Sequence, residues 1–442
     1  MTKYLFNIVE KFEDGDNKIK VCIIGLGYVG LPLLINCAKS GCDATGIDID
    51  ARVITKLNFF KSHIDGIEDH EIKELNDNYL VGYSTDYAPV QEADVIIIAV
   101  PTPLSKDNIT PDLLPIDMAV HNIIDEINAA PIKARLVILE STVYPGVTEE
   151  NVSFPIHYYT KMIRGENLFV AFSPERVDPG NVSFNTKNTP KLVGGVDRQS
   201  SLLAEKFYSK IVDTVVRTSN ARVAEFAKLY ENSFRAVNIA LANELMMLAR
   251  AKGVPFEEVS ESAATKPFGF TRFNPGPGVG GHCIPVDPLY LSYYSRLSKH
   301  SLPLIDTAMK INEKMPEYVL GIIKDHFATA KVSSLDVDVY ILGMTYKPDI
   351  SDLRESPSIE LYYLLEENDF RVKYHDPYVN YIEGIGQSTP LTHNELKRSE
   401  LVVLMVDHTK YVETCDFILK NAKCILDTKV MFDPGLDKII SL

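Results

Sequence analysis

Several features that would assign this chain to a simple class are missing from it. Its 442 residues contain no apolar run of about 20 residues, the length that a membrane-spanning helix needs. The N-terminus has no long apolar segment, and residues 10–16 are acidic, so we expect no secretory signal. No low-complexity segment or short tandem repeat is visible. These absences predict a soluble, cytoplasmic protein that does not enter a membrane.

Cysteine and positive charge are also scarce. None of the six cysteines forms a C-x-x-C pair, and no His/Cys cluster has zinc spacing, so we expect no metal site. Cys22, Cys37 and Cys42 lie in or beside the first predicted strand–helix unit, where they suit a core in a reducing compartment. Lys and Arg number 45 against 60 Asp and Glu, a net charge of −15 that argues against general nucleic-acid binding. A phosphorylated ligand would need local backbone amides, helix N-termini and a few cations.

The sequence does contain two series of strands that alternate with helical patterns. Apolar, β-branched runs predict buried strands at 18–24, 43–49, 94–100, 136–139 and 169–172. A second series follows at 336–342, 370–374, 400–406 and 423–426, with Ser356 and Pro357 opening a helix within it. We therefore predict an α/β fold with two Rossmann-like, doubly wound domains.

A helical segment separates the two series. Apolar residues recur at helical spacing over residues 220–253, which is long for a globular helix. This helix either connects two domains and forms a dimer surface, or is a plain core helix. The expected domains are 1–217 (dinucleotide binding), 218–317 (central, helical) and 318–442 (second Rossmann-like unit), in a homodimer or higher homo-oligomer.

The first strand leads into a dinucleotide-binding fingerprint. Gly25, Gly27 and Gly30 fit G-x-G-x-x-G, in which the glycines allow a tight turn, close approach of a pyrophosphate and packing of helix on strand. Asp48 ends the next strand, where a carboxylate binds ribose hydroxyls and repels a 2′-phosphate. This favours NAD over NADP, although Arg52 nearby weakens the preference. The alternatives are a Rossmann domain that binds no cofactor and an Asp48 that is merely a solvated strand end.

A thiol in a glycine-rich segment suggests a second chemical step. Cys283 follows Gly276-Pro277-Gly278-Val279-Gly280-Gly281-His282, and Asp287 lies four residues beyond it. We interpret the glycines as space in which a ligand approaches the backbone closely. A thiol can trap an aldehyde as a thiohemiacetal, from which a second hydride can leave to give a thioester. Lys228 and Asn232 share a helix face and could stabilise an oxyanion, or could simply be solvated. We read His282 as structural or substrate-contacting, and leave Lys266 and Arg272 open between phosphate contacts and solvated charges.

The ordered motifs of the chain resemble those of the UDP-glucose/GDP-mannose dehydrogenase family over nearly the whole length. They are Gly-Leu-Gly-Tyr-Val-Gly (25–30), Val-Pro-Thr-Pro (100–103), Glu-Ser-Thr-Val-Tyr-Pro-Gly (140–146), Ser-Pro-Glu-Arg-Val-Asp-Pro-Gly (173–180), Ala-Glu-Phe-Ala-Lys-Leu-Tyr-Glu-Asn (224–232), the segment 276–288, Leu-Gly-Met-Thr-Tyr-Lys-Pro-Asp (342–349) and Arg-Glu-Ser-Pro (354–357). The resemblance implies an NAD domain, a central dimerisation domain and a nucleotide-sugar domain. It also implies an NAD-dependent, four-electron oxidation of a sugar C6 alcohol.

The resemblance assigns a role to individual residues. Cys283 would be the nucleophile, Lys228 and Asn232 would hold the substrate oxygen, and Asp287 would be a base or orient water. Thr142 would hold the hydrolytic water together with a carboxylate, and the role of base in this step would fall on Glu175, Asp287 or a water network. The expected cofactor-binding residues are Gly25, Gly27, Tyr28, Val29, Gly30, Asp48, Arg52, Pro101, Thr102, Thr142 and Arg354. The expected substrate-binding residues are Glu175, Lys228, Asn232, Arg272, Gly280 and Lys347.

Two departures from the family pattern narrow the substrate. Pro179 stands where UDP-glucose enzymes have a second glutamate, and Val286 stands where some have a basic residue. With His282 before the cysteine, these positions look like the subgroup that acts on UDP-N-acetylhexosamines. The best match is UDP-N-acetylglucosamine, with the mannosamine and galactosamine epimers and UDP-glucose as alternatives. A two-electron hydroxyacid-type dehydrogenase and a catalytically silent NAD- or UDP-sugar-binding regulator are the rival functions.

Overall fold

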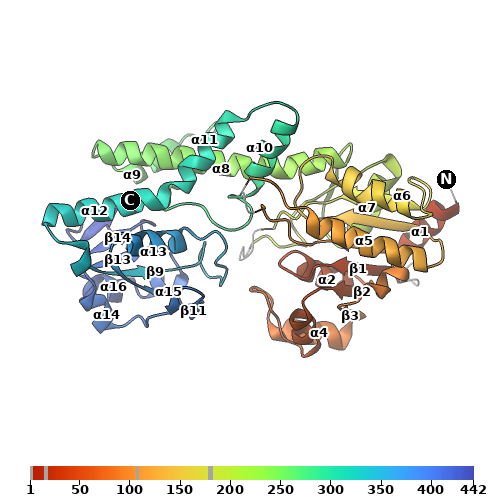
Figure 1. Cartoon of the computed structure of the whole chain (residues 1–442), viewed down its shortest axis with the longest axis horizontal. Helices are drawn as coiled ribbons and strands as arrows, with labels where there is room; N and C mark the ends of the chain where they lie inside the picture. Colours follow the sequence, from red (N-terminus) through yellow and green to blue (C-terminus); the bar gives the residue numbers. More distant parts are fainter. Residues whose placement is uncertain (1–2, 14–17, 106–108, 178–182) are drawn as a thin grey trace. The chain divides into compact units, whose positions relative to one another are not determined.

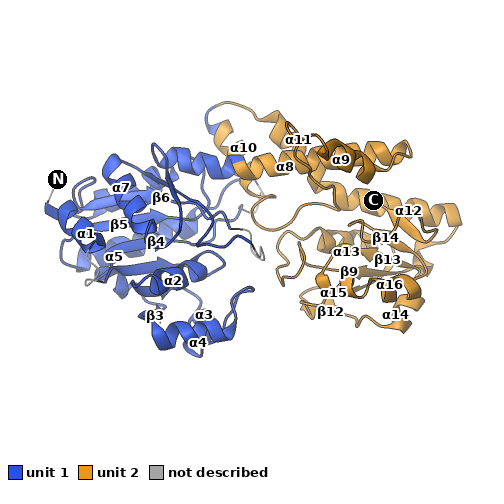
Figure 2. Ribbon diagram, turned by 180° about the vertical axis from the view of Figure 1, so that it is seen from behind, with its two compact units in different colours: residues 1–230, 296–298 blue, residues 231–295, 299–442 orange. Residues whose placement is uncertain are grey.

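The computed structural model describes residues 3–13, 18–105, 109–177 and 183–442. The chain divides into two compact units (Figure 2). Unit 1 comprises residues 1–230 with 296–298, and unit 2 comprises residues 231–295 with 299–442. Both units are built around a sheet with helices on its two faces, as the alternating sequence pattern predicts.

Unit 1 contains a sheet of order β3-β2-β1-β4-β5-β6-β7-β8. The strands are β1 (Lys20–Ile24), β2 (Asp43–Ile47), β3 (Val81–Ser84), β4 (Val95–Ile98), β5 (Arg135–Leu139), β6 (Leu168–Phe172), β7 (Lys191–Gly195) and β8 (Val215–Arg217). Neighbouring strands from β3 to β6 are parallel, as expected. The expectation of a purely parallel sheet is wrong at β7, which pairs antiparallel with β6 through Ala171 and Phe172.

Alternating side chains of these strands enter two separate cores. On β1, Val21 and Ile23 join one apolar cluster, whereas Cys22 and Ile24 join the other. Helices α1 (Lys3–Glu13), α2 (Gly30–Lys39) and α7 (Arg198–Tyr208) cover the first face, and α5 (Leu114–Ala129) and α6 (Phe154–Tyr159) cover the second. Helices α3 (Ala51–Asn58) and α4 (Asp69–Asn78) complete the unit. Because both faces are covered, the strands are continuous apolar runs.

Two findings in unit 1 concern the sequence analysis. The prediction that three cysteines are core residues is confirmed, and helix α1 was not expected. Cys22, Cys37 and Cys42 are buried in unit 1. Helix α1 packs Phe12 against Phe207, with ring centroids 6.0 Å apart. No helix in the described part of the chain is long and apolar enough to cross a membrane.

Helix α8 (Ala221–Ala251) is a single helix of 31 residues, as the long apolar period predicts (Figure 1). It is followed by α9 (Phe256–Ala264), α10 (Asp287–Leu297), α11 (Pro303–Glu313) and α12 (Met315–Ala330). Residues at successive turns of α8 remain exposed although they are apolar. They are Val223, Phe226, Tyr230, Phe234, Leu241, Leu245 and Leu248. We call this set the α8 stripe.

Unit 2 contains the second sheet, of order β10-β9-β13-β14-β15, in which every pair is parallel. Its elements are β9 (Asp338–Leu342), α13 (Pro357–Glu367), β10 (Arg371–His375), α14 (His393–Arg398), β13 (Leu401–Leu404), α15 (Thr409–Glu413), α16 (Cys415–Asn421), β14 (Ile425–Asp427) and β15 (Ile439–Ser441). A small hairpin, β11 (Tyr381–Ile382) and β12 (Gly386–Gln387), lies beside it. Ser356 caps α13 by accepting a hydrogen bond from the backbone N–H of Ser358, and Pro357 is the first residue of that helix, as predicted.

Candidate functional site

The glycines of the fingerprint serve two different purposes. A Cβ on Gly25 would lie 2.5 Å from the carbonyl oxygen of Ala99, and one on Gly30 would lie 1.8 Å from that of Gly25. These two glycines are therefore required by the packing of the chain itself. A Cβ on Gly27 would meet no atom within 4 Å. This open position, just before the N-terminus of α2, fits a pyrophosphate that approaches the backbone.

Asp48 is held in place at the carboxyl end of β2. Its Oδ2 accepts a hydrogen bond from the backbone N–H of Leu26 at 2.9 Å, and its Oδ1 accepts one from Asp50 at 2.9 Å. A carboxylate has about four acceptor positions, so two remain for ribose hydroxyls. Arg52 is paired with Asp50, with 2.7 Å between Nη2 and Oδ2, and this guanidinium is the main cause that lowers the pKa of Asp50 to about 2. These residues therefore fit NAD.

The other fingerprint residues lie next to the same strand ends. Val29 immediately precedes α2, and the hydroxyl of Tyr28 donates to Asp65 Oδ2 at 3.4 Å. Pro101 and Thr102 follow the end of β4, which is the strand next to β1. The expected cofactor residues of unit 1 are thus gathered at the carboxyl ends of adjacent parallel strands, where such sheets bind ligands.

Thr142 and Glu175 occupy equivalent positions on the next two strands. Leu139 pairs with Phe172 at the end of β5 and β6, so each of the two residues stands three positions past its strand. Lys228 on α8 is 7% exposed and donates a hydrogen bond from Nζ to Thr142 Oγ1. The two residues that were expected to act on substrate oxygen and water are therefore in contact. Pro179 lies outside the described residues.

Glu225 fixes the first turns of α8 to the segment that follows Thr142. Its Oε1 accepts hydrogen bonds from the backbone and hydroxyl of Thr148, at 2.9 and 2.6 Å, and its Oε2 accepts one from Gly146 at 2.7 Å. Burial raises the pKa of Glu225, and these donors oppose the shift. Sequence analysis did not single out Glu225. It positions Lys228, three residues later on the helix, near Thr142.

Glu175 belongs to a buried polar cluster that sequence analysis missed. Lys191 Nζ donates to Glu175 Oε2 at 3.1 Å and to Glu140 Oε2 at 2.9 Å. The hydroxyl of Tyr208 donates to Glu140 Oε1. Burial and the charge of Glu175 raise the pKa of Glu140, although Lys191 opposes the shift. Burial also acts against ionised Glu175, but Lys191 and two backbone N–H groups outweigh it and lower that pKa.

In unit 2, the segment with the nucleophile candidate is tied to α8 and α10. Asp287 is the first residue of α10 and is 1% exposed. Its backbone N–H donates to the carbonyl of Cys283 at 2.8 Å, and its Oδ2 accepts a hydrogen bond from Asn232 Nδ2 at 2.6 Å. Asn232, Asp287 and half-buried Cys283 thus form one cluster, and Asn232 lies four residues after Lys228 on the same helix. The structure thus brings Asn232 into direct contact with Asp287.

The glycines before Cys283 have a different purpose from the one expected. We interpreted them as space for a ligand, but a Cβ on Gly280 would lie 2.5 Å from Cβ of Tyr346. A Cβ on Gly281 would lie 2.8 Å from the Tyr346 ring, and one on Gly278 would lie 2.9 Å from the ring of Pro357. These three glycines therefore allow close packing of the chain on itself, and a substrate contact at Gly280 stays a prediction. Gly281 also donates its N–H to the carbonyl of Arg354 at 2.9 Å.

Two buried asparagines anchor the start of the glycine segment. Asn243 Oδ1 accepts a hydrogen bond from the N–H of Gly276 at 2.9 Å, and its Nδ2 donates to Asn312 Oδ1 at 3.0 Å. Half-buried Lys429 lies nearby, with its Nζ 3.9 Å from where a Cβ of Gly276 would be. Burial lowers the pKa of Lys429, against the charges of Asp407 and of Asp427. The sequence around Lys429 did not indicate a functional site, because a lone lysine after a strand is ordinarily solvated.

Two further arginines of the predicted site are, like Arg52, paired with a carboxylate. The guanidinium of Arg354 donates from Nη2 to Asp352 Oδ2 at 2.6 Å, and its side chain is 45% exposed. Arg272 donates to Glu257 and lies 3.7 Å from Glu261. Pairing with protein carboxylates leaves less of their charge available to a phosphate.

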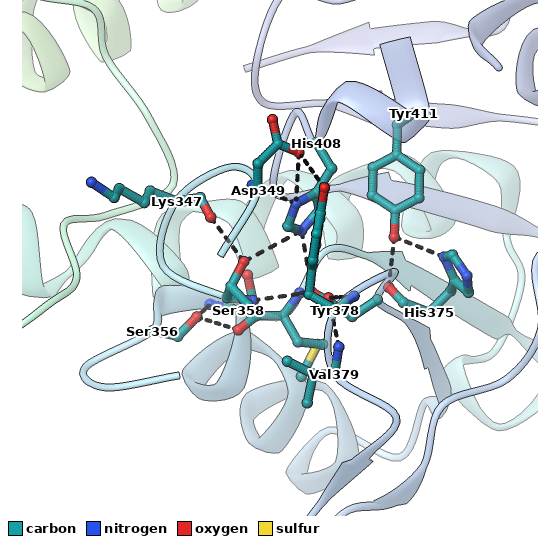
Figure 3. A network of polar contacts seen from close by, with 12 residues as sticks. Lys347, Asp349, Ser356, Ser358, His375, Tyr378, Val379, His408 and Tyr411 are labelled. Carbon is teal, nitrogen blue, oxygen red and sulfur yellow. Dashed lines mark hydrogen bonds and ion pairs between the residues drawn. The ribbon is translucent and has the colours of Figure 1, made fainter. Parts of the chain in front are cut away.

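Lys347 lies in a loop that is held in place by a hydrogen bond to the buried side chain of His408 (Figure 3). His408 Nδ1 accepts the N–H of Asp349 at 2.9 Å, and its Nε2 lies 3.2 Å from Asp376 Oδ2. The carbonyl of Lys347 accepts a hydrogen bond from Thr345 Oγ1 at 2.9 Å, while its side chain points away from this network. Asp376 also accepts the N–H of Tyr378 at 2.8 Å. These backbone contacts of Asp376 are typical of a turn that ends a strand.

Comparison with known proteins covers all three parts of the chain. Residues 19–212 match the NAD binding domain of the UDP-glucose/GDP-mannose dehydrogenase family, residues 222–314 its central domain, and residues 340–434 its UDP binding domain. A UDP-N-acetyl-D-mannosamine dehydrogenase of Pyrococcus horikoshii is 34% identical, covering 89% of this chain and 90% of that protein. A UDP-N-acetyl-D-glucosamine 6-dehydrogenase of Pseudomonas aeruginosa is 30% identical, covering 94% and 97%.

Solved structures agree with these matches. The structure of a UDP-D-ManNAc dehydrogenase from Pyrococcus horikoshii superposes with a TM-score of 0.86 at 33% identity, covering 96% of this chain and 98% of that one. The fold and the order of motifs are therefore shared over nearly the full length. The chain belongs to the UDP-glucose/GDP-mannose dehydrogenase family, as an NAD-dependent nucleotide-sugar dehydrogenase.

Proposed function

We propose that this enzyme oxidises the C6 alcohol of a UDP-N-acetylhexosamine to the uronate, with two NAD reduced per sugar. The observation that carries the proposal is the cluster of Cys283, Asp287 and Asn232. A simple alcohol dehydrogenase has no need for a thiol that lies four residues before a buried carboxylate, with the two residues joined through their backbones. A thiol is needed when an aldehyde must be retained and oxidised again.

The first oxidation requires stabilisation of the substrate oxygen as it loses its proton. Lys228 supplies a positive charge, and Asn232 supplies an amide donor from the same face of α8. The NAD, when bound, supplies the acceptor for the hydride of C6. Glu225 keeps Lys228 in register with Thr142. The product of this step is the C6 aldehyde.

The second oxidation passes through Cys283. Its sulfur adds to the aldehyde carbon, and the carbonyl oxygen, stabilised by Lys228, becomes that of a thiohemiacetal. Loss of a second hydride from C6 to a second NAD then leaves a thioester. Water attacks the acyl carbon, the carbon–sulfur bond breaks, and Cys283 departs as a thiolate. Glu175 accepts the proton of that water, while Asp287 orients the substrate with Asn232.

Our choice between the hexosamine epimers is based on the proteins to which this chain is similar. Proteins similar to this chain include UDP-N-acetyl-D-mannosamine dehydrogenases from several archaea and a UDP-N-acetyl-D-glucosamine 6-dehydrogenase. We therefore place the mannosamine epimer before the glucosamine epimer that the motifs alone favoured. Lys347 and Lys429 are the candidate cations for the charged parts of this substrate.

The test is the number of NADH formed per sugar consumed. UDP-N-acetylmannosamine, UDP-N-acetylglucosamine, UDP-N-acetylgalactosamine and UDP-glucose are each supplied in limiting amount to the native enzyme, to Cys283→Ala and to the control Cys415→Ala. We expect two NADH per sugar for one hexosamine, lost in Cys283→Ala and kept in the control. One NADH per sugar in native and Cys283→Ala alike would favour a two-electron dehydrogenase. NAD binding without any turnover would favour a silent regulator.

We also propose that two copies associate through the α8 stripe. Seven apolar side chains exposed along one helix are a large unpartnered surface for a monomer. Leu241→Glu combined with Leu245→Glu should convert a dimer into a monomer in sedimentation equilibrium, and Glu244→Gln should not.

The domain limits 1–217, 218–317 and 318–442 and the cytoplasmic location stay predictions.

A further inference from the structure

The polar cluster of Glu140, Lys191, Glu175 and Tyr208 is unusual for the interior of a sheet. It is made within unit 1 by the ends of β5 and β6, the first residue of β7 and the last residue of α7. The side chains of Glu140 and Lys191 are 0% and 4% exposed, whereas that of Glu175 is 13% exposed. Glu175 is thus the member of the ion triad that is nearest to solvent.

Stability alone does not explain why such a triad is kept. Desolvation of buried ions offsets most of their attraction, so an apolar replacement of similar volume is often as stable or more stable. Here one ammonium serves two carboxylates, which leaves the cluster one negative charge in excess. The two carboxylates therefore compete for one cation, and the surroundings decide which of them ionises more readily.

The surroundings favour ionisation of Glu175 over that of Glu140. Glu175 Oε1 accepts the backbone N–H groups of Arg176 and Val177 at 2.9 and 2.8 Å, in addition to the bond from Lys191 to Oε2. Three of about four acceptor positions are filled, and one is left for a further donor such as water. Glu140 instead receives only side-chain donors, from Lys191 and Tyr208.

We propose that Lys191 and Glu140 are positioning residues that keep Glu175 ionised and oriented, so that Glu175 accepts the proton of the water that hydrolyses the Cys283 thioester. This inference rests on the function proposed above. Lys191 supplies the charge that keeps Glu175 ionised. Glu140 also pairs with Lys191 and so weakens the effect of the ammonium on Glu175, which therefore remains basic enough to take a proton.

Two other titratable groups of the described chain face the cluster. Tyr208 on α7 and Cys37 on α2 face it, and burial is the largest cause that raises the pKa of each well above its ordinary value. The guanidinium of Arg176, on the same segment as Glu175, donates to the carbonyl of Pro190 at 2.8 Å. Tyr208 and Cys37 therefore stay uncharged near neutral pH, and the ions paired within the cluster are Lys191, Glu140 and Glu175.

The proposal predicts opposite effects from two substitutions. Hydrolysis of the thioester should slow at low pH as Glu175 becomes protonated, and this decline is the acidic limb of the pH–rate profile. Lys191→Met removes the cation, so the limb should move to higher pH, by roughly 1–3 pH units for loss of an adjacent opposite charge. Glu140→Gln removes the competing carboxylate, so the limb should move to lower pH and the plateau rate should fall. Lys191→Arg should restore most of the native profile. A merely structural role would not displace the limb in two directions.

The experiment follows the acyl-enzyme directly. The full-length enzyme is mixed with NAD and its UDP-N-acetylhexosamine, quenched in acid at successive times, and weighed by intact-protein mass spectrometry at each pH. Glu175→Gln identifies the limb by removing it. Lys206→Met is the matched control, since Lys206 is an exposed lysine of α7 whose partner is Glu13.

The outcomes separate this inference from the proposed function. Displacement of the limb in opposite directions by Lys191→Met and Glu140→Gln, with the control unchanged, supports it. A thioester in the native enzyme whose limb is the same in both variants would show that the triad is structural. If Lys191→Met does not fold, Glu140→Gln and Lys191→Arg still test the proposal. Absence of any thioester in the native enzyme would overturn the proposed function and this inference with it.

Discussion

Asn232 Nδ2 donates a hydrogen bond of 2.6 Å to Oδ2 of Asp287, which joins the middle of α8 to the first residue of α10. Asp287 is buried, so its second carboxylate oxygen is fixed along with the first. Cys283 accepts the backbone N–H of Asp287. The amide of Asn232 therefore fixes the carboxylate beside the nucleophile candidate, in addition to any contact with substrate.

Asn232→Ala should lower kcat far more than it changes folding. The substitution removes a donor near the developing oxyanion and leaves Asp287 without that partner, and loss of one such donor costs about 10²–10³-fold in kcat. Steady-state NADH formation measures the effect, and thermal unfolding checks the fold. Asn238→Ala is the control, because this amide on the same helix donates only to the carbonyl of Phe234. Equal activity of the two variants would exclude a catalytic or positioning role for Asn232.

Gly27→Ala and Gly280→Ala should fail for different reasons. A Cβ on Gly27 meets no atom within 4 Å, so stability should be unchanged while the KM for NAD rises, because the new methyl occupies the place expected for the pyrophosphate. A Cβ on Gly280 would overlap Tyr346 and the carbonyl of Glu355. Gly280→Ala should therefore lower the free energy of unfolding by about 1–3 kcal/mol. Urea unfolding measures the stability of each variant, and NAD titration measures its affinity for NAD. A Gly27→Ala variant that is destabilised but binds NAD as the native enzyme does would contradict the assignment of Gly27 to the pyrophosphate site.

Asp48→Asn should weaken NAD binding and reduce the preference over NADP. The amide keeps one acceptor for Leu26 or for Asp50 but loses the negative charge that faces a ribose. Loss of one charged hydrogen bond corresponds to about 1.5–3 kcal/mol, which is roughly a 10- to 100-fold rise in the KM for NAD. The ratio of kcat/KM for the two cofactors measures the change. Asp77→Asn, at the exposed end of α4, should leave that ratio unchanged.

The sequence predicts this fold well where local pattern and burial agree. The run Val95–Ile98 is apolar because helices cover both faces of its sheet, and the long apolar period predicts α8 to within a residue or two. The antiparallel β7 was not predicted, because pairing direction depends on the path of the chain and not on apolar content. Helix α1 was missed for a similar reason, since its role appears only where Phe12 meets Phe207.

Candidate site residues could be named from the sequence, but their contacts could not. The family resemblance pointed to Cys283, Asp287, Lys228 and Asn232, yet motif spacing cannot say which atom a glycine makes room for. The glycines at 278–281 accommodate Tyr346 and Pro357, which lie more than 60 residues later in the sequence. Lys191 gave no signal at all, because a lysine at the first position of a strand is ordinarily at the surface. Its importance depends on two carboxylates that only the folded sheet brings to it.

His375 should remain uncharged well below the usual pH of a histidine. Burial is the main cause that lowers its pKa to about 4, and the charge of Lys410 adds to the shift although Asp376 opposes it. The hydroxyl of Tyr411 donates to the carbonyl of His375 at 2.8 Å and lies 2.8 Å from Nδ1, which assigns the Nδ1 proton to a bond toward that hydroxyl. NMR of the enzyme labelled at histidine carbons, with His375→Gln to assign the signal, measures this pKa.

The same shift predicts how stability depends on pH. The unfolded chain protonates His375 near pH 6.5, whereas the folded chain does so near 4, so the unfolded state binds more protons between these values. The free energy of unfolding should therefore be highest above pH 6.5 and should decline as the pH falls toward 4. Urea midpoints at pH 7 and pH 5 should differ less in His375→Gln than in the native protein, while the exposed His121→Gln serves as the control for loss of a ring. A midpoint difference that is identical in native protein and His375→Gln would show that other groups cause the decline.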